Sequence, residues 1–314
     1  MSRATLPPVD HATDPQRSLE EAFLAEQPRL IGLAYRILGS RVDAEDVVQE
    51  AWIRIRRHDD ADGVDRPAAW LTRVVSRLAL DELRTARRRR ESYVGPWLPE
   101  PVRAGPGPSS STPTEPEAVA ELAESLTVAF LQVLERLDPV ERVVLLLADV
   151  FSVPFDEIAR IVDRSPAACR QVASRARRRV ADDHRRAVVR PDDAAAVVAE
   201  LLGAVAAGEV DRVVALLADD AVLVSDGGPS VHAARRPVVG ASRVARFLVN
   251  VSGRLPSLRA ELTTLNGAPG LVLWGPDGAD AAIVTEVVDG RVARIYLVRN
   301  PEKLASLGDH RPLV

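Results

Sequence analysis

The sequence predicts a multidomain protein in which two all-α domains precede a C-terminal α+β domain. Apolar residues recur at helical spacing from residue 18 to residue 90 and again from residue 125 to residue 190, as they do in helices with one buried face. A stretch rich in proline, glycine and serine separates these two parts, which is typical of a linker. Beyond residue 257 the apolar runs become short and are separated by turn sequences, as in the strands of a sheet.

Composition limits the class of protein. A chain of 314 residues with 46% hydrophobic residues can form two or three domains with real cores. The single cysteine, Cys169, excludes an internal disulfide and fits a reducing compartment. Neither a membrane-spanning run nor the apolar core of a signal peptide is present. We therefore expect a cytoplasmic protein without membrane contact.

Residues 1–17 are expected to be a disordered lead-in, followed by a helix from Ser18 to Leu38 that Gly39 ends. The next helix, residues 43–57, carries an apolar stripe and, on another face, Asp43, Asp46 and Glu50. This acidic face has two interpretations. It is either a solvated face with acids favoured near the helix N-terminus, or a surface on which a partner docks.

A third helix is expected over residues 67–90, since Pro67 suits a first helical turn. Trp70 begins its apolar stripe, either as a core anchor or as a functional side chain. Arginines favour helix C-termini, but five within seven residues exceed what capping needs and favour phosphate binding. These residues are Arg84, Arg87, Arg88, Arg89 and Arg90. The first domain therefore spans residues 18–92.

Residues 93–124 form the linker, and its first part is unusual. Between Tyr93 and Pro101 it holds two aromatic residues and three prolines, including a Trp97–Leu98 pair. Such a segment is stiff and apolar, so we expect it to dock on another part of the protein.

Residues 125–190 are net basic and helical. Asp138 and Pro139 start one helix, residues 155–162 form a short one, and Ser165 and Pro166 begin a last, basic helix to residue 179. A short helix, a tight turn and a basic helix predict a helix-turn-helix. The alternative is a helical hairpin whose basic residues are only solvated.

Residues 191–314 are net acidic and change pattern. Helices followed by strands predict an α+β domain with a curved antiparallel sheet. Asp289–Gly290 is a strong hairpin signal. The expected helices cover residues 194–207, 210–218 and 240–251, and the expected strands residues 221–225, 258–266, 270–274, 281–288 and 291–298.

Catalysis is weakly supported. Asp226, His232, Asp277 and Asp280 would be the acid–base candidates. Asp226 and Asp277 stand beside glycine, however, where aspartate usually serves a turn. No nucleophile is paired with a base and no metal-ligand spacing occurs, so we expect neither an enzyme nor a cofactor or metal.

Several stretches resemble one family. DAEDVVQEAWIRIRR at residues 43–57, with the aromatic-then-arginine helix after it, resembles region two of extracytoplasmic-function sigma factors. LDPVERVVLLL and FDEIARIVDRSPAACRQVASRARRR resemble region four. WLPEP at residues 97–101 and NPEKL at residues 300–304 resemble the subgroup with a fused SnoaL-like, nuclear-transport-factor-two-like cone. That subgroup's Asp-Gly-Gly-Gly-Lys stands here as Asp226-Gly-Gly-Pro-Ser230, without the last glycine and the lysine.

The resemblance implies a protein that brings core RNA polymerase to minus-ten and minus-thirty-five promoter elements, with the β and β′ subunits and promoter DNA as partners. The residues implied to bind polymerase are Asp43, Asp46, Gln49 and Glu50. Those assigned to DNA in the first domain are Trp70, Arg73, Arg77, Arg84, Arg87 and Arg88. Those assigned to DNA in the helix-turn-helix are Arg170, Gln171, Ser174, Arg175, Arg177 and Arg178.

We further expect the C-terminal domain to dock on the linker and to regulate the chain in cis, with Lys303 near enough to pair with Glu100. The residues of this expected contact are Trp97, Leu98, Pro99, Glu100, Pro101, Asp226, Asn300, Pro301, Lys303 and Leu304. The alternatives are a passive domain on a flexible tether, and a SnoaL-type enzyme or ligand sensor fused to a DNA-binding module. We expect a monomer in the free state. The promoter, the inducing signal, an anti-sigma partner and any small-molecule ligand of the C-terminal domain stay open.

Overall fold

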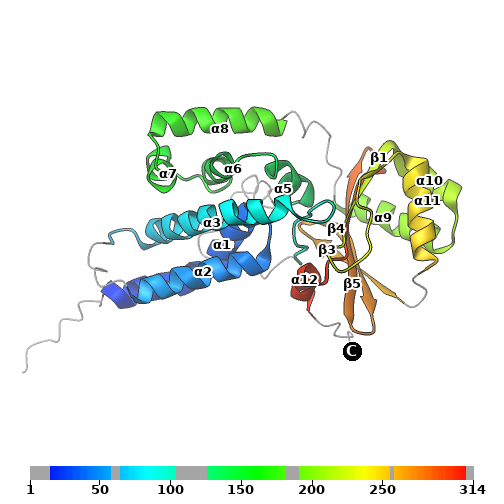
Figure 1. The fold of residues 1–314 in the computed structure, drawn as a ribbon, viewed down its shortest axis with the longest axis horizontal. Helices are drawn as coiled ribbons and strands as arrows, with labels where there is room; N and C mark the ends of the chain where they lie inside the picture. Colours follow the sequence, from blue (N-terminus) through cyan, green and yellow to red (C-terminus); the bar gives the residue numbers. More distant parts are fainter. Residues whose placement is uncertain (1–14, 58–63, 104–125, 182–190, 255–257, 309–314) are drawn as a thin grey trace, which may run out of the picture.

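The computed structural model describes residues 15–57, 64–103, 126–181, 191–254 and 258–308. Its helical part and its sheet-containing part lie side by side along the long axis of the molecule (Figure 1). Most of the predicted N-terminal lead-in, of the loop before residue 67 and of the linker falls outside the described residues. The lead-in was expected to extend to residue 17, but the first helix begins at Pro15. Within the described helices, none is long and apolar enough to cross a membrane.

The N-terminal bundle consists of α1 (Pro15–Leu38), α2 (Arg41–Arg56) and α3 (Pro67–Glu91). Gly39 has a positive φ of 72°, which ends α1. Ser40 then caps α2 by accepting a hydrogen bond from the Asp43 N–H at 3.2 Å. The apolar stripe predicted for α2 is buried: Ala44, Val47, Val48, Ala51 and Ile55.

The second helical part consists of α5 (Val128–Leu134), α6 (Pro139–Leu145), η2 (Leu146–Val150), α7 (Phe155–Val162) and α8 (Pro166–Ala181). Asp138 and Glu141 form a capping box at the start of α6. Asp163 ends α7 in the left-handed region at φ 55°, so α7 and α8 form the expected helix-turn-helix. The π-helical turn η2 follows α6 directly, and in it the Phe151 N–H donates to the Leu146 carbonyl.

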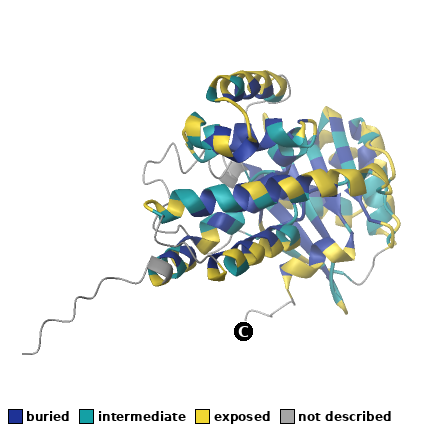
Figure 2. Cartoon of the chain, turned by 60° about the vertical axis from the view of Figure 1, so that its left-hand side comes forward, coloured by how far each residue is buried: buried dark blue, intermediate teal, exposed yellow. Residues whose placement is uncertain are grey.

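The two helical parts are not separate bodies. One buried apolar cluster contains Leu33 and Val75 from the first part together with Val144 and Cys169 from the second. Arg142 of α6 is buried in this contact, where it pairs with Glu135 and donates to the Arg36 carbonyl at 3.1 Å. Buried residues accordingly run through the interior of the bundle, while α8 shows exposed residues along its outer side (Figure 2).

The C-terminal domain has a six-stranded sheet in the order β2-β1-β6-β5-β4-β3. Its helices are α9 (Pro191–Ala206), α10 (Val210–Leu216), α11 (Ala241–Ser252) and α12 (Pro301–Leu304), which is followed by the 3-10 turn η3 (Ala305–Leu307). Its strands are β1 (Leu217–Asp226), β2 (Val238–Val239), β3 (Arg259–Leu265), β4 (Ala268–Gly275), β5 (Gly278–Val288) and β6 (Arg291–Val298).

Two expectations for this domain were wrong in detail. The sheet is mixed and not antiparallel throughout, because β1 pairs with β6 in parallel. The second helix ends at Leu216, and the strand begins at Leu217 instead of residue 221. The register shifts between Leu217 and Val222, and the residues between them are partly exposed and acidic, so no regular alternation marks the start of the strand.

Side chains of successive strand residues point to opposite faces of this sheet. One face carries Leu223 and Ile295 and packs against α9 and α11. The other face carries Val284 and Tyr296 and packs against Leu98 of the linker, Val128, Leu304 and Leu307. The sheet therefore separates α9 and α11 from the surface that meets the linker, on which α12 also lies.

Candidate functional site

The acidic face of α2 is accessible. Asp46, Gln49 and Glu50 are exposed, and Asp43 is half-buried near the N-terminus of the helix. Glu50 pairs with Arg54 at 3.0 Å, and Asp43 lies 3.9 Å from Arg89. Because the opposite stripe of α2 is buried, these carboxylates can meet a partner without any change in the bundle.

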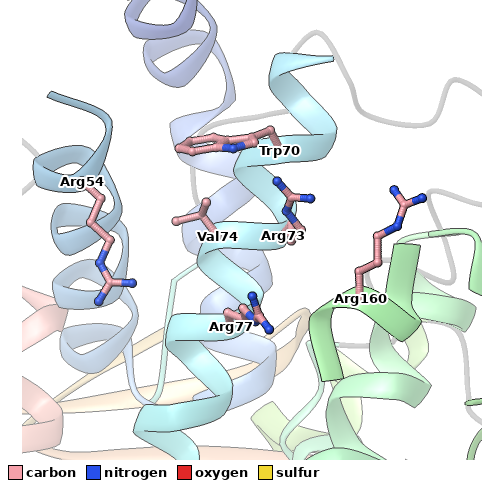
Figure 3. A pocket seen from close by; sticks show the side chains of 6 residues that line it. All are labelled: Arg54, Trp70, Arg73, Val74, Arg77 and Arg160. Atoms are coloured by element: carbon pink, nitrogen blue, oxygen red, sulfur yellow. The ribbon is translucent and has the colours of Figure 1, made fainter. Parts of the chain in front are cut away.

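The aromatic start of α3 borders a basic cavity of about 540 Å³ (Figure 3). Trp70, Arg73 and Arg77 come from α3, Arg54 from α2, and Arg160 from α7 of the helix-turn-helix. Among the described residues, no carboxylate pairs with Arg73, Arg77 or Arg160. Unpaired guanidinium groups beside an aromatic ring suit the phosphates and bases of a nucleic acid.

The arginines that crowd the end of α3 differ in their burial and in their contacts, and Arg89 pairs with Glu82 of the same helix at 2.6 Å. Arg84 and Arg88 are exposed and make only local contacts within α3. Arg87 is exposed but donates to the Leu137 carbonyl at 3.0 Å, and so ties α3 to the second helical part. Arg90, by contrast, is largely buried and pairs with Glu135 at 2.7 Å. Burial lowers its pKa, which Glu135 partly offsets, so Arg90 has a structural place in this arrangement.

The six residues assigned to the recognition helix α8 are all exposed: Arg170, Gln171, Ser174, Arg175, Arg177 and Arg178. Their opposite face, with Val172, Ala173 and Ala176, is buried. Arg170 lies 5.5 Å from the ring centre of Phe155, and Arg177 makes a two-pronged ion pair with Asp149. This outer face of α8 is thus solvated, and Arg177 is already held in its ion pair with Asp149.

The helix-turn-helix lies against the face of the first bundle that carries Trp70 and Arg73. Besides the cavity that Arg160 shares with Trp70, Arg66 pairs with Glu157 of α7 at 2.9 Å. The same two parts are joined at the other end of α3 by Arg90 and Glu135. The two helical parts are therefore joined at both ends of α3.

Asp226 is the centre of the contact between linker and C-terminal domain. Its carboxylate is 1% exposed and accepts four hydrogen bonds. The donors are the Tyr93 hydroxyl at 2.6 Å, the Leu98 N–H at 2.9 Å, the Gly228 N–H at 3.0 Å and Lys303 Nζ at 2.6 Å. Four donors satisfy a buried carboxylate that would otherwise be costly. We call the contact among Tyr93, Leu98, Asp226, Asn300 and Lys303 the linker dock.

Lys303 completes the linker dock with contacts on two sides. Nζ also donates to the Leu98 carbonyl at 2.5 Å and lies 4.1 Å from the ring centre of Trp97. Arg90 lies 3.5 Å from the same ring centre, so the indole contacts two cations. Burial lowers the pKa of Lys303 to about 8, against the opposing effect of Asp226.

The expected pair between Lys303 and Glu100 does not form as an ion pair, because Asp226 takes that place. Glu100 instead points to the start of α2, where its Oε2 accepts from the Arg41 N–H at 2.7 Å. A carboxylate at a helix N-terminus satisfies free N–H groups and complements the dipole. The WLPEP segment therefore caps the helix that carries the acidic face. Pro99 and Pro101, on either side of Glu100, are buried with it.

Glycines permit the close approach at two points. A Cβ on Gly39 would lie 2.7 Å from the Trp97 ring, and one on Gly228 would lie 2.8 Å from the Asn300 side chain. Both glycines have positive φ angles. Pro229 and Ser230, where the chain departs from the subgroup's motif, are exposed, so the departure leaves the linker dock intact.

Asn266 forms a second linker contact that the sequence analysis missed. It is 1% exposed, and its side chain donates to the Tyr35 hydroxyl at 2.6 Å and accepts from the Val102 N–H at 3.1 Å. Asn266 has a positive φ of 52° in the turn between β3 and β4. The Asn266–Gly267 pair marks that turn in the sequence, but nothing local indicates that its side chain reaches the linker.

The four acid–base candidates lie in different surroundings in the structure. Asp226 is committed to the linker dock, Asp280 pairs with Arg299 at 2.9 Å, and Asp277 is exposed in the turn between β4 and β5. His232 lies in a separate small cavity with Gly227 and Arg235. Across the described part of the chain, no group of three or more His, Cys, Asp or Glu side chains is arranged to hold a metal ion.

Comparison with known proteins matches both helical parts. Residues 22–89 match the family model of Sigma-70 region 2, and residues 127–180 match that of Sigma-70, region 4. The chain is 41% identical over 292 residues to the ECF RNA polymerase sigma factor SigJ of Mycobacterium tuberculosis, which covers 90% of this chain and 91% of that protein. It is 29% identical over 287 residues to the probable ECF RNA polymerase sigma factor SigI of the same organism, which covers 91% of this chain and 94% of that one.

A solved structure extends the likeness to the C-terminal domain. The crystal structure of the Mycobacterium tuberculosis extracytoplasmic function sigma factor SigJ matches with a TM-score of 0.69 at 38% sequence identity. The match covers 94% of this chain and 100% of that one. The arrangement of helical parts and sheet domain is therefore shared over almost the whole chain.

Proposed function

This chain belongs to the extracytoplasmic-function RNA polymerase sigma factors, and we propose that its linker dock controls it in cis. As a member of this family it directs RNA polymerase to promoters and initiates transcription. Its C-terminal domain is of the SnoaL-like kind. Its work is binding, without catalysis of its own, and it acts in the cytoplasm beside the polymerase.

The polymerase contact is proposed for Asp46, Gln49 and Glu50, with Asp43 at its edge. These side chains are exposed on the face of α2 opposite its buried stripe. A solvated acidic face can pair with basic residues on the β and β′ subunits at little desolvation cost. The capping of α2 by Glu100 places this surface next to the linker dock.

Promoter contacts are proposed for two faces. Trp70, Arg73 and Arg77 would meet the minus-ten element, with Arg84, Arg87 and Arg88 on nearby phosphates. The outer face of α8 would enter the major groove at the minus-thirty-five element, where Arg170 suits guanine and Gln171 suits adenine. Ser174 and Arg175 lie on the same face, while Arg177 and Arg178 would hold phosphates.

The single observation that carries regulation in cis is the burial of Asp226 under the linker. Through it, the C-terminal domain holds Tyr93, Leu98 and, by way of Trp97, Arg90 at the end of α3. The same arrangement keeps the helix-turn-helix on the nucleic-acid face of the first bundle. We infer that the docked chain cannot place its two DNA-reading faces on separated promoter elements, and that polymerase binding shifts the population towards an undocked chain.

A double-mutant cycle tests this proposal. Asp226→Ala leaves Lys303 as a buried charge without its partner, which is costly by about 3–5 kcal/mol and should open the linker dock. Asp226→Ala/Lys303→Met removes both partners and should close it again in part. We expect Asp226→Ala to increase the radius of gyration of the free chain and to change run-off transcription, and the double variant to lie nearer the wild type.

A control variant and a contradicting outcome complete this test. Asp219→Ala removes an exposed carboxylate from the same strand and should change neither measurement. If Asp226→Ala leaves both compactness and transcription at wild-type values while the C-terminal domain stays folded, the domain is a passive passenger and regulation through the linker dock is wrong.

A further inference from the structure

A cavity of about 220 Å³ lies inside the C-terminal domain between the sheet and helices α9 and α11. Its wall is mostly aliphatic, with Leu201 and Phe247 from the helices and Leu271, Ile283 and Ile295 from the strands. These strand residues alternate with those that face the linker, so the cavity and the linker dock occupy opposite faces of one sheet. An engineered cavity of about 150 Å³ with similar walls stays dry and binds benzene, so this one has room for a substituted ring.

One charged side chain belongs to the wall. Arg299 follows β6 directly, and its Nη2 pairs with Asp280 at 2.9 Å. Its Nε–H is buried and no described residue accepts it. A buried donor without an acceptor is costly and uncommon, so a molecule in the cavity that accepts this hydrogen bond would remove that cost.

We propose that this cavity binds a small, uncharged, mainly apolar molecule whose carbonyl oxygen accepts the hydrogen bond from Arg299 Nε–H. A pure hydrocarbon would fill the space and leave the donor unsatisfied. A carboxylate would face Asp280, which already neutralises Arg299, in apolar surroundings that disfavour a second anion. A water molecule needs two to four polar partners, and besides Arg299 the wall offers chiefly the Ser252 and Thr285 hydroxyls.

Arg299 also connects the cavity with the linker dock. Its backbone N–H donates to the Asp226 carbonyl at 2.7 Å, and the next residue, Asn300, donates to the Tyr93 hydroxyl at 2.9 Å. The cavity in this docked structure is already formed and carries the unsatisfied donor. Because Arg299 and Asn300 are held by the linker dock, a ligand on Arg299 binds the docked chain more tightly than the undocked chain, and this difference in affinity stabilises the docked state. This second step rests on the proposed function, whereas binding itself does not.

Three probes of similar shape test the binding site on the full chain: acetophenone, isopropylbenzene and benzoate. By calorimetry or NMR titration we expect acetophenone to bind roughly three- to tenfold tighter than isopropylbenzene, as one hydrogen bond predicts, and benzoate to bind weakest. Arg299→Met should remove the preference for acetophenone without weakening isopropylbenzene. Asp280→Asn should strengthen benzoate, because it removes the competing anion.

The following results would contradict the proposed binding site for an uncharged carbonyl compound. Equal affinity of the wild type for acetophenone and isopropylbenzene would exclude a role for the Nε–H, and benzoate as the tightest probe would make this an anion site. No binding of any probe would make the cavity a packing void. Leu202→Trp, which puts a larger side chain into the wall, should abolish binding of all three, and persistent binding would place the probes elsewhere.

Coupling to the linker dock is measured separately by the rate at which an amine-reactive reagent modifies Lys303. Saturating acetophenone should slow this modification in the wild type, and an unchanged or faster rate would overturn the coupling. Asp226→Ala should still bind acetophenone, but more weakly than the wild type, because coupling between docking and binding is reciprocal. If Lys303 of the ligand-free wild type is modified as fast as in Asp226→Ala, the linker dock itself is wrong and the binding site is unaffected.

Discussion

Lys303 and Asp226, 77 residues apart in the chain, form a buried ion pair with 2.6 Å between Nζ and Oδ2. Lys303 is the single lysine of the sequence. It holds the linker through the Leu98 carbonyl while Asp226 holds it through the Leu98 N–H. One residue of the linker is thus bound on both sides of its peptide backbone, which fixes its position along the sheet.

Chemical modification of Lys303 should report the linker dock directly. The amine is buried, so a reagent reaches it only when the chain opens. We expect Trp97→Ala, which removes the ring between Arg90 and Lys303, to raise the modification rate of Lys303 by about tenfold for each 1.4 kcal/mol of lost docking energy. Mass spectrometry of the peptide that contains Lys303 measures it, with the N-terminal amine as the internal reference. A rate equal to that of the wild type would contradict the contact.

The stability of the chain should rise between pH 8 and pH 10. Burial lowers the pKa of Lys303 from its ordinary 10.5 to about 8, so in this window the unfolded chain binds the proton that the folded chain has released. Relative to Lys303→Met, the free energy of unfolding should increase by about 2 kcal/mol over these two pH units. Denaturant titrations of both proteins at pH 7.5 and 10 measure the difference, and a flat or falling difference would contradict the shift.

Reversing charges on the surface proposed to bind RNA polymerase should remove polymerase binding without unfolding the protein. Asp46→Arg/Glu50→Arg reverses two exposed charges, and only the Arg54–Glu50 surface pair is lost, which is worth about 1 kcal/mol or less. Co-purification with core RNA polymerase should disappear while the melting temperature stays nearly unchanged. Glu200→Arg/Glu209→Arg, the same charge change in the C-terminal domain, should keep binding. Equal losses of folding would make the acids structural.

Two substitutions on the outer face of α8 should weaken DNA binding in different ways. Arg170→Ala should cost about 1–3 kcal/mol on the preferred upstream element and shift its sequence, because a base contact is lost. Arg178→Ala should weaken all sequences alike and reduce the salt dependence of binding. Competition binding to a library of upstream elements at two salt concentrations separates them, and a uniform loss in both variants would show that Arg170 does not face the bases.

Much of the site's framework follows from local patterns. The stripe of Ala44, Val47 and Ile55 predicts α2 and leaves Asp46 and Glu50 on the opposite face, and the structure confirms that division. Asp138–Pro139 and Ser165–Pro166 start helices where the capping rules place them. Such signals act within one or two turns of chain, so they are visible without knowing the fold.

Pairings between residues far apart in the chain could not be predicted from local patterns. The sequence alone determined most of the helices, the helix-turn-helix, most strand boundaries and the prediction that Trp97–Leu98 needs an apolar partner, but it did not reveal the short helix α12. Only the tertiary structure decided that Lys303 pairs with Asp226 and that Glu100 caps α2. It also decided that Arg90 is buried beside Glu135 and that β1 runs parallel to β6. The physical reason is that a buried charge pairs with whichever opposite charge the packing brings within about 3 Å. The sequence offers several acidic and basic residues that are equally suitable locally, and only the fold decides which of them come together.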